Sequence, residues 1–214
     1  MTTAALVDDH PVFRQGLKLL FEMHGDPRVV AETSLPEEAV EIVRRTRPDV
    51  VLLDLVFPDG VSGVSVAHQL LRRNPAERIL FVSMVKDEMR VADALETGAL
   101  GYATKDQSAE ELVQAVRTVA AGRPYLAATL PTERIDAQRR ALRENARLGN
   151  LSSLTGRERQ IFDMTVAGLT AAAIGEKLSI SRRTVETHRA RILSKLGVHS
   201  AAELVRIAAR AGML

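Results

Sequence analysis

The sequence predicts two modules of different fold class: an α/β module with a doubly wound, five-stranded parallel sheet, followed by an all-α module of four helices. Over residues 1–121, short apolar runs alternate with segments of helical period, whereas from residue 151 the pattern is helical throughout. The charge changes as well. Residues 1–121 hold 13 Lys and Arg against 19 Asp and Glu, a net charge of −6, while residues 122–214 carry +8. The net charge of +2 is therefore the sum of an acidic module and a basic one. This division suggests that the basic module meets a polyanion, and the alternative is two solvated surfaces of opposite charge, between which charge alone does not decide.

Five apolar runs predict the strands of the first module. The third run is apolar at every position, which is typical of a parallel strand covered on both faces. Ser34 with Glu37, and Ser108 with Glu111, have the spacing of a capping box and predict two helix starts. The predicted strands cover residues 4–7, 28–31, 50–53, 79–82 and 100–103.

Polar residues follow four of these strands. Asp8 and Asp9 come after the first strand, Asp54 after the third, Ser83 after the fourth and Lys105 soon after the fifth. The carboxyl ends of parallel strands form the ligand-binding edge of such sheets, so we expect these groups to converge. Clustered carboxylates repel one another unless a cation shares them, and Mg²⁺ prefers oxygen ligands. The pattern predicts a Mg²⁺ site where a carboxylate can accept a phosphoryl group.

These motifs resemble the receiver domain of bacterial response regulators over about residues 3–122. The motifs that carry the resemblance are Leu6-Val7-Asp8-Asp9-His10-Pro11, Leu52-Leu53-Asp54-Leu55-Val56-Phe57-Pro58, Ser83, and Gly98-Ala99-Leu100-Gly101-Tyr102-Ala103-Thr104-Lys105. One departure is Gly63, which stands one residue later after Pro58 than is usual, so the loop after the third strand is expected to differ without losing a site residue.

The resemblance implies a flavodoxin-like sheet and a role for each matching residue. Asp54 is implied as the phosphoacceptor and Asp9 as a direct Mg²⁺ ligand beside it. Asp8 completes the metal pocket, largely through water, and the Val56 carbonyl adds an oxygen. Lys105 is implied to pair with the phosphoryl group, and Ser83 and Tyr102 are implied as switch residues. From the residues alone, we expect His10 to shape the helix start rather than to bind metal or act in catalysis.

Residues 122–150 predict a basic, partly helical linker. Pro124 and Pro131 interrupt regular secondary structure, and good helix formers then extend over residues 132–147. We expect the arginines of this stretch to be solvated rather than to touch DNA phosphates.

Four short helices are predicted in residues 151–214. Thr155 with Glu158 and Ser200 with Glu203 form capping boxes, Thr170 can cap the second helix, and Gly197 ends the third. A small turn joins the second helix to an arginine-rich third helix, which is typical of a helix-turn-helix.

The helical wheel of the third helix separates a core face from an outward face. Val185, Ile192 and Leu196 fall together and are predicted to face the core. We expect the outward face to enter a DNA major groove, with Arg182 and Lys195 at phosphates. The residues expected nearer the bases are Arg183, Glu186, Thr187, Ala190 and Arg191. The predicted DNA-binding residues are Arg182, Arg183, Thr184, Glu186, Thr187, Ala190, Arg191 and Lys195.

This module resembles the LuxR-type DNA-binding domain. The matching motifs are Leu154-Thr155-Gly156-Arg157-Glu158-Arg159, Ala167-Gly168-Leu169-Thr170, residues 178–188 and Lys195-Leu196-Gly197-Val198. Together the two modules resemble the NarL/FixJ class of response regulators. Ala171-Ala172-Ala173 and Gly175 depart from the family pattern and predict a weaker second helix with fewer phosphate contacts. The resemblance implies that the fourth helix dimerises on DNA, and packing within the monomer is the alternative.

We therefore predict a transcription regulator gated by phosphorylation of Asp54, with Mg²⁺ as cofactor. The expected partners are duplex DNA, a cognate sensor histidine kinase, a second copy of the chain when phosphorylated or on DNA, and RNA polymerase. The chain is not expected to be an enzyme beyond its own phosphotransfer and dephosphorylation. The alternatives are a phosphorylation-independent LuxR-type regulator and an aspartyl-phosphate phosphotransferase, which commonly carries a second Asp where Val56 stands.

Composition excludes several other classes. Cysteine is absent, which excludes disulfide scaffolds, thiol catalysis and Cys-ligated metals. No apolar run reaches the roughly 18 residues of a membrane span, and the N-terminus lacks a signal-peptide pattern, so a cytoplasmic protein without membrane contact is expected.

Overall fold

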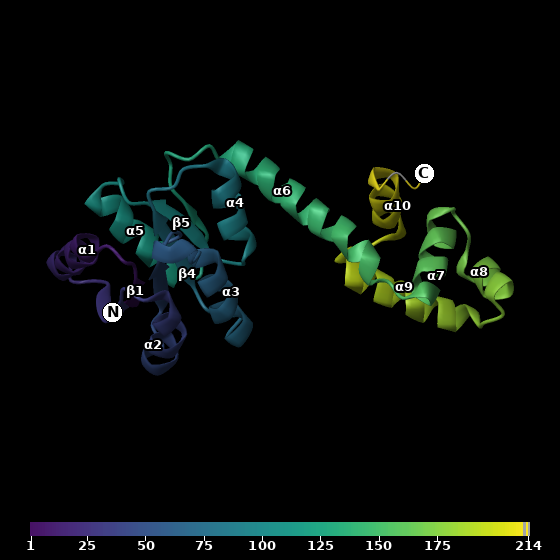
Figure 1. Ribbon diagram of the computed structural model, residues 1–214, viewed down its shortest axis with the longest axis horizontal. Helices are drawn as coiled ribbons and strands as arrows, with labels where there is room; N and C mark the ends of the chain where they lie inside the picture. Colours follow the sequence, from purple (N-terminus) through teal and green to yellow (C-terminus); the bar gives the residue numbers. More distant parts are fainter. Residues whose placement is uncertain (212, 214) are drawn as a thin grey trace. The chain divides into compact units, whose positions relative to one another are not determined.

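The computed structural model describes residues 1–211 and 213, with only the backbone described at residues 59 and 147–149. The chain divides into two compact units, Met1–Arg139 and Arg140–Leu214 (Figure 1). None of the helices in the described ranges combines the length and the apolar character needed to cross a membrane.

A parallel sheet forms the centre of the first unit. Within the described residues the strand order is β2-β1-β3-β4-β5-β6, and every neighbouring pair is parallel. The doubly wound sheet is thus confirmed, but it has one strand more than the five predicted. The additional strand, β6, has only two residues and forms no apolar run that would stand out in the sequence. The strands are β1 (Thr3–Val7), β2 (Arg28–Thr33), β3 (Val50–Leu53), β4 (Ile79–Ser83), β5 (Gly101–Thr104) and β6 (Tyr125–Leu126).

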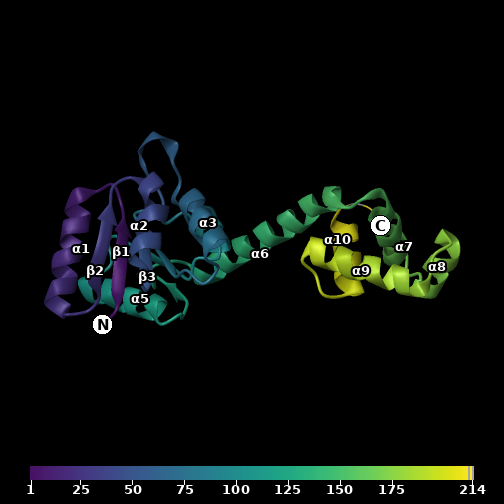
Figure 2. The same cartoon turned by 90° about the horizontal axis from the view of Figure 1, so that it is seen from below.

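Helices cover both faces of this sheet (Figures 1 and 2). Leu17 and Phe21 of α1 share one hydrophobic core with Val113 and Val116 of α5, while α2, α3 and α4 lie on the other face. This arrangement leaves the carboxyl ends of the strands open for a site. The helices are α1 (Pro11–His24), α2 (Ala39–Thr46), α3 (Gly63–Arg73), α4 (Glu88–Glu96) and α5 (Ala109–Ala120), with short 3-10 helices η1 (Pro36–Glu38) and η2 (Pro58–Gly60).

One of the two predicted capping boxes of this unit is correct. The Ser108 side chain accepts from the Glu111 N–H at 3.2 Å, and the Ser108 N–H donates to Glu111 Oε2 at 3.0 Å. The box predicted at Ser34 and Glu37 is wrong, because Pro36 begins a 3-10 turn and α2 starts only at Ala39. The Thr33 hydroxyl takes over the local polar contact by donating to Glu38 Oε2 at 2.6 Å.

Helix α6 (Thr132–Gly149) begins within the first unit. Ile135 is fully buried, Arg134 pairs with Glu88 at 2.9 Å, and Arg139 pairs with Glu96 at 2.8 Å. The first compact unit therefore extends beyond residue 121, where the sequence predicts a linker to begin. Arg134 is 74% exposed and stays solvated as expected, whereas Arg139, at 29%, is partly buried against α4.

The second unit has its own apolar core. Thr155 caps α7 with the predicted capping box, and Thr170, Ser181 and Ser200 accept from backbone N–H groups at the starts of α8, α9 and α10. The elements are η3 (Asn150–Ser153), α7 (Gly156–Val166), α8 (Ala171–Leu178), α9 (Arg182–Leu196) and α10 (Ala201–Arg210).

Gly175 has a structural reason that the sequence does not reveal. A Cβ at this position would lie 2.7 Å from the Ile180 carbonyl oxygen, closer than side-chain carbons approach. Glycine therefore allows the turn between α8 and α9 to fold back onto α8. In this chain the glycine is therefore required by the close approach of the turn and is not only a weakening of α8.

Candidate functional site

Two buried carboxylates and one lysine meet at the carboxyl edge of the sheet. Asp8 follows β1 and Asp54 follows β3, and these strands are neighbours, while Lys105 follows β5. Asp8 is 5% exposed and Asp54 is 3% exposed. The convergence expected from the strand ends is thus present for these three side chains.

Lys105 bridges the two acids. Its Nζ lies 2.6 Å from Asp54 Oδ2 and 2.8 Å from Asp8 Oδ2, and it also lies over the ring of Phe13, 4.8 Å from its centroid. Buried carboxylates need a partner of opposite charge. A single ammonium supplies it to both Asp8 and Asp54.

The two carboxylate oxygens of Asp54 are in different environments. Oδ1 accepts hydrogen bonds from the N–H groups of Leu55 at 2.6 Å and Val56 at 3.3 Å, whereas Oδ2 pairs with Lys105. The loop that follows is held by a bridge between Val56 and Ser62 and by a hydrogen bond from Gly63 N–H to Leu55 O at 2.8 Å. The backbone therefore fixes Oδ1, whereas side chains hold Oδ2.

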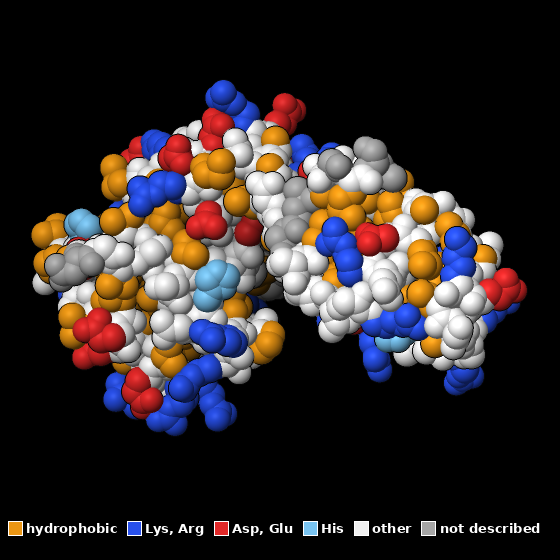
Figure 3. Space-filling view, turned by 45° about the vertical axis from the view of Figure 1, so that its right-hand side comes forward, with side chains coloured by type: hydrophobic (Ala, Val, Ile, Leu, Met, Phe, Trp, Pro, Cys, Tyr) orange, Lys and Arg blue, Asp and Glu red, His pale blue; other side chains and the backbone are white. Residues whose placement is uncertain are grey.

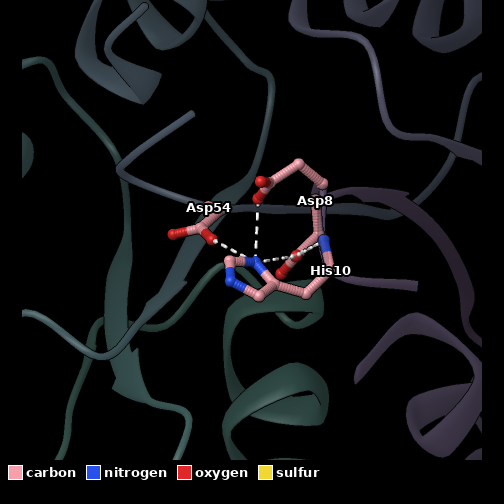
Figure 4. Close-up of side chains that lie close together, drawn as sticks. Asp8, His10 and Asp54 are labelled. Carbon is pink, nitrogen blue, oxygen red and sulfur yellow. Dashed lines mark hydrogen bonds and ion pairs between the residues drawn. The ribbon is translucent and has the colours of Figure 1, made fainter. Parts of the chain in front are cut away.

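His10 joins this cluster, although the sequence predicts for it only a role at the helix start (Figure 4). Its Nδ1 lies 2.8 Å from Asp9 Oδ1, 3.2 Å from Asp8 Oδ1 and 3.7 Å from Asp54 Oδ2. The backbone N–H of His10 also donates to Asp8 Oδ1 at 2.8 Å, so the expected role at the helix start is present as well. The available signal in the sequence was its position directly after the Asp pair.

The donor set fits a divalent cation. Ligand atoms of Asp8, Asp9, His10 and Asp54 all lie within 4.8 Å of one another. Asp9 Oδ1 is buried, and no described residue donates a hydrogen bond to it with acceptable geometry. Three carboxylates with such an oxygen suit a hard cation such as Mg²⁺.

Ser83 and Tyr102 lie behind the acidic edge, on β4 and β5. Both are buried, and the Tyr102 hydroxyl donates to the Val85 carbonyl at 2.8 Å in the loop that leads to α4. Burial raises the pKa of Tyr102, an effect that a hydrogen bond with Ser83 reduces. The phenol therefore stays neutral and acts as a hydrogen-bond donor to the loop.

A second candidate site is the outward face of α9. Val185, Ile192 and Leu196 are fully buried, as the helical wheel predicts. Lys and Arg side chains gather along the lower edge of the second unit in Figure 3, the edge at which α9 lies in Figure 1. The exposed residues of the predicted face are Arg182, Arg183, Thr184, Glu186, Thr187, Ala190, Arg191 and Lys195.

Several of these side chains already have partners within the unit. Arg182 Nε donates to Glu186 Oε1 at 2.8 Å, and the Thr187 hydroxyl donates to the Arg183 carbonyl at 3.0 Å. Lys195 Nζ lies 2.7 Å from Glu158 Oε2, so the ammonium predicted to contact a phosphate is engaged with α7.

Glu158 is a buried anion that joins two helices. The hydrogen bond from Lys195, supported by that from the Thr155 N–H, lowers the pKa of Glu158 to about 2. Because the folded pKa lies below the ordinary value of 4.5, Glu158 stabilises the fold above pH 4.5, and this stabilisation disappears as the pH falls toward 2.

A Glu158→Gln variant is expected to unfold at a lower temperature than wild type at pH 7, and this difference should shrink as the pH falls from 4.5 toward 2. Thermal unfolding of the full chain, followed by circular dichroism across this pH range, measures it. Glu176→Gln, which removes an exposed carboxylate from α8, is the matched control. A difference between Glu158→Gln and wild type that stays constant with pH would contradict the assigned role.

Both units match known protein families. Residues 4–117 match the response regulator receiver domain family, and residues 152–208 match the bacterial regulatory proteins of the luxR family. The chain is 34% identical to the transcriptional regulatory protein DegU of Brevibacillus brevis, covering 94% of this chain and 89% of that protein. It is 36% identical to the nitrate/nitrite response regulator protein NarL of Escherichia coli (strain K12), covering 94% of this chain and 92% of that protein.

The fold agrees with a solved structure as well. A LuxR-family two-component response regulator from Aurantimonas sp. SI85-9A1 matches with a TM-score of 0.60 and 34% identity, over 65% of this chain and 98% of that chain. The chain therefore belongs to the NarL/FixJ class of two-component response regulators, transcriptional regulators rather than classical enzymes, which join a receiver domain to a LuxR-type DNA-binding domain.

Proposed function

We propose that Asp54 accepts a phosphoryl group from a sensor histidine kinase and that this modification gates dimerisation and sequence-specific binding of duplex DNA. The observation that carries the proposal is the position of Lys105 Nζ, 2.6 Å from Asp54 Oδ2 and 2.8 Å from Asp8 Oδ2, at a buried strand end. A cation there offsets charge on the oxygens of a phosphoryl group in transfer.

The environments of the two oxygens indicate which one reacts. Asp54 Oδ1 is held by two backbone N–H groups, so Oδ2 is the oxygen that attacks phosphorus. A P–O bond forms at Oδ2 as the bond between phosphorus and the donor breaks, and the donor leaves with that electron pair. Lys105, which loses the charge of Oδ2 as a partner, then pairs with a phosphoryl oxygen.

The acidic residues would hold Mg²⁺. Asp9 and Asp54 would bind it directly, Asp8 largely through water, and the Val56 carbonyl would supply a further oxygen. When bound, the ion supplies positive charge that lowers the repulsion between these carboxylates and the incoming phosphoryl oxygens.

Ser83 and Tyr102 would transmit the modification to α4. Tyr102 donates to the Val85 carbonyl, and Asp87, two residues further on, caps α4. Glu88 and Glu96 of α4 hold Arg134 and Arg139 of α6. A shift of Tyr102 would therefore change the loop before α4 and, through α4, the contacts of α6.

The outward face of α9 would read DNA. Arg183, Thr184, Glu186, Thr187, Ala190 and Arg191 are exposed and would approach bases, while Arg182 would approach a phosphate. We do not assign a phosphate contact to Lys195, because Glu158 already holds its ammonium. Leu204, Ile207 and Ala208 of α10 are buried in the core of the second unit, so this helix packs within the monomer, and dimerisation would use its exposed side. RNA polymerase would be a further partner, and the protein would act in the cytoplasm.

Selection of bound DNA from a random pool, with and without acetyl phosphate and Mg²⁺, tests this function. We expect the phosphodonor to enrich paired half-sites about one helical turn apart. Intact mass measured in parallel should show one added phosphoryl group. Equal enrichment with and without the donor, together with no added mass, would favour the alternative of a phosphorylation-independent regulator.

A further inference from the structure

Arg189 lies on α9 but does not belong to its outward face. It follows Val185, a fully buried residue, by four positions, so it lies about 40° around the helix from the line that faces the core. The sequence assigns it no role. An arginine on the inner side of a helix needs hydrogen-bond partners inside the unit.

Those partners lie on α7 and in the turn that leads to α8. Arg189 Nε donates to Thr165 Oγ1 at 3.0 Å, and Nη2 donates to the Leu169 carbonyl at 2.7 Å. Thr165 is 5% exposed, and its hydroxyl donates in turn to the Ile161 carbonyl at 2.7 Å. One planar guanidinium thus connects α9 to the end of α7 and to the residue before the Thr170 cap of α8.

The position of the charge adds to this connection. Helix α7 ends at Val166, and the carbonyl groups at a helix C-terminus attract cations. The guanidinium also fits because its donors form a rigid fork, which a lysine ammonium cannot reproduce. Val185 and Ile192 hold α9 against the core through apolar contacts, which are non-directional. Arg189 supplies directional contacts in the middle of the helix.

We propose that Arg189 is a positioning residue for DNA recognition: it sets the rotation of α9, and hence which side chains meet the bases, without contacting DNA itself. This inference rests on the proposed role of α9 as the DNA reader. Base contacts depend on the angle at which a recognition helix enters the groove, whereas phosphate attraction tolerates small rotations. Loss of Arg189 should therefore lower specificity and leave non-specific binding intact.

The test compares variants of the full chain on two duplexes of equal length, one carrying the sequence selected by wild type and one unrelated, over a series of salt concentrations. Arg189→Gln and Thr165→Val are expected to lose about tenfold in affinity for the selected sequence, the scale of one base contact. Their affinity for the unrelated duplex and the slope of log affinity against log salt should stay at wild-type values.

Two further variants distinguish positioning from a phosphate contact. Arg182→Gln, at the exposed start of the same helix where a phosphate contact is proposed, is expected to weaken binding to both duplexes and to reduce the salt slope by about one. Arg189→Lys keeps the charge but loses the fork, so it should behave like Arg189→Gln. The double variant of Arg189→Gln and Thr165→Val should be no weaker than Arg189→Gln alone, because both remove one shared contact.

Several outcomes would overturn the inference. They are a reduced salt slope for Arg189→Gln, wild-type binding by Arg189→Lys, or unchanged specificity in Thr165→Val. Binding is measured below each variant's unfolding midpoint, and if Arg189→Gln does not fold, Arg189→Lys and Thr165→Val decide. If wild type itself selects no sequence, the proposed function fails together with the inference. If wild type selects a sequence and the variants bind that sequence as tightly as wild type does, the inference fails and the proposed function stands.

Discussion

An Asp54→Asn variant is expected to take up no phosphoryl group from acetyl phosphate and Mg²⁺, whereas the wild-type chain takes up one. The amide is neutral and a far weaker nucleophile than the carboxylate whose Oδ2 lies 2.6 Å from Lys105 Nζ. The variant should fold, because Lys105 keeps Asp8 as a partner at 2.8 Å. Intact mass measures uptake directly. DNA affinity, measured with and without the donor, should be raised by the donor for wild type only.

Asp93→Asn is the matched control for this experiment. Asp93 is an exposed carboxylate of the same unit, on α4, and its loss should leave phosphoryl uptake unchanged. Uptake by Asp54→Asn at the wild-type level would show that another carboxylate is the acceptor, and peptide mapping would identify it. A variant that takes up nothing but still gains DNA affinity with the donor would show that gating does not pass through Asp54.

Gly63→Ala is expected to destabilise the first unit by about 3 kcal/mol or more, at the upper end of the cost of overpacking. A Cβ at Gly63 would lie 2.0 Å from the backbone oxygen of Asp54 and 3.0 Å from Leu55 Cα. Neither neighbour is a flexible side-chain end, so the backbone beside the phosphoacceptor must move. We expect phosphoryl uptake to fall as well, since the N–H groups of Leu55 and Val56 that hold Asp54 Oδ1 belong to this backbone.

Gly16→Ala provides the control. Gly16 lies within α1 and a Cβ there would meet nothing within 4 Å, so alanine should stabilise the helix by about 0.5–1 kcal/mol. Urea unfolding of the two variants and of wild type gives both free energies. Stability of Gly63→Ala within a few tenths of a kcal/mol of wild type would mean that the loop relaxes without cost.

The main features of the fold and of the acidic edge could be predicted because they follow from local patterns. Alternating apolar runs and helical segments place the carboxyl ends of parallel strands on one edge. This brings Asp8, Asp54 and Lys105 together whatever the conformation of the loops. The core face of α9 follows in the same way from the spacing of Val185 and Ile192. In both cases the periodicity of the element determines the side on which a residue lies.

The rest depends on contacts between distant segments. The approach of His10 Nδ1 to three carboxylates and the clash that excludes a side chain at Gly63 arise only when the strands and loops are in place. A helical wheel places Arg189 and Lys195 on faces but does not show that Thr165 and Glu158 receive them. The capping box at Ser34 failed for a different, local reason, since Pro36 starts a 3-10 turn before the helix.

The two residues of β6 have a consequence for how the chain can be divided. Tyr125 N–H donates to the Leu100 carbonyl and Ala127 N–H to the Tyr102 carbonyl, so β6 covers one side of β5. A receiver fragment that stops at residue 121 would leave β5 as an open edge, which is a template for aggregation, and would remove the buried Ile135. A fragment that ends at Arg139 keeps both, although the cut then falls inside a helix.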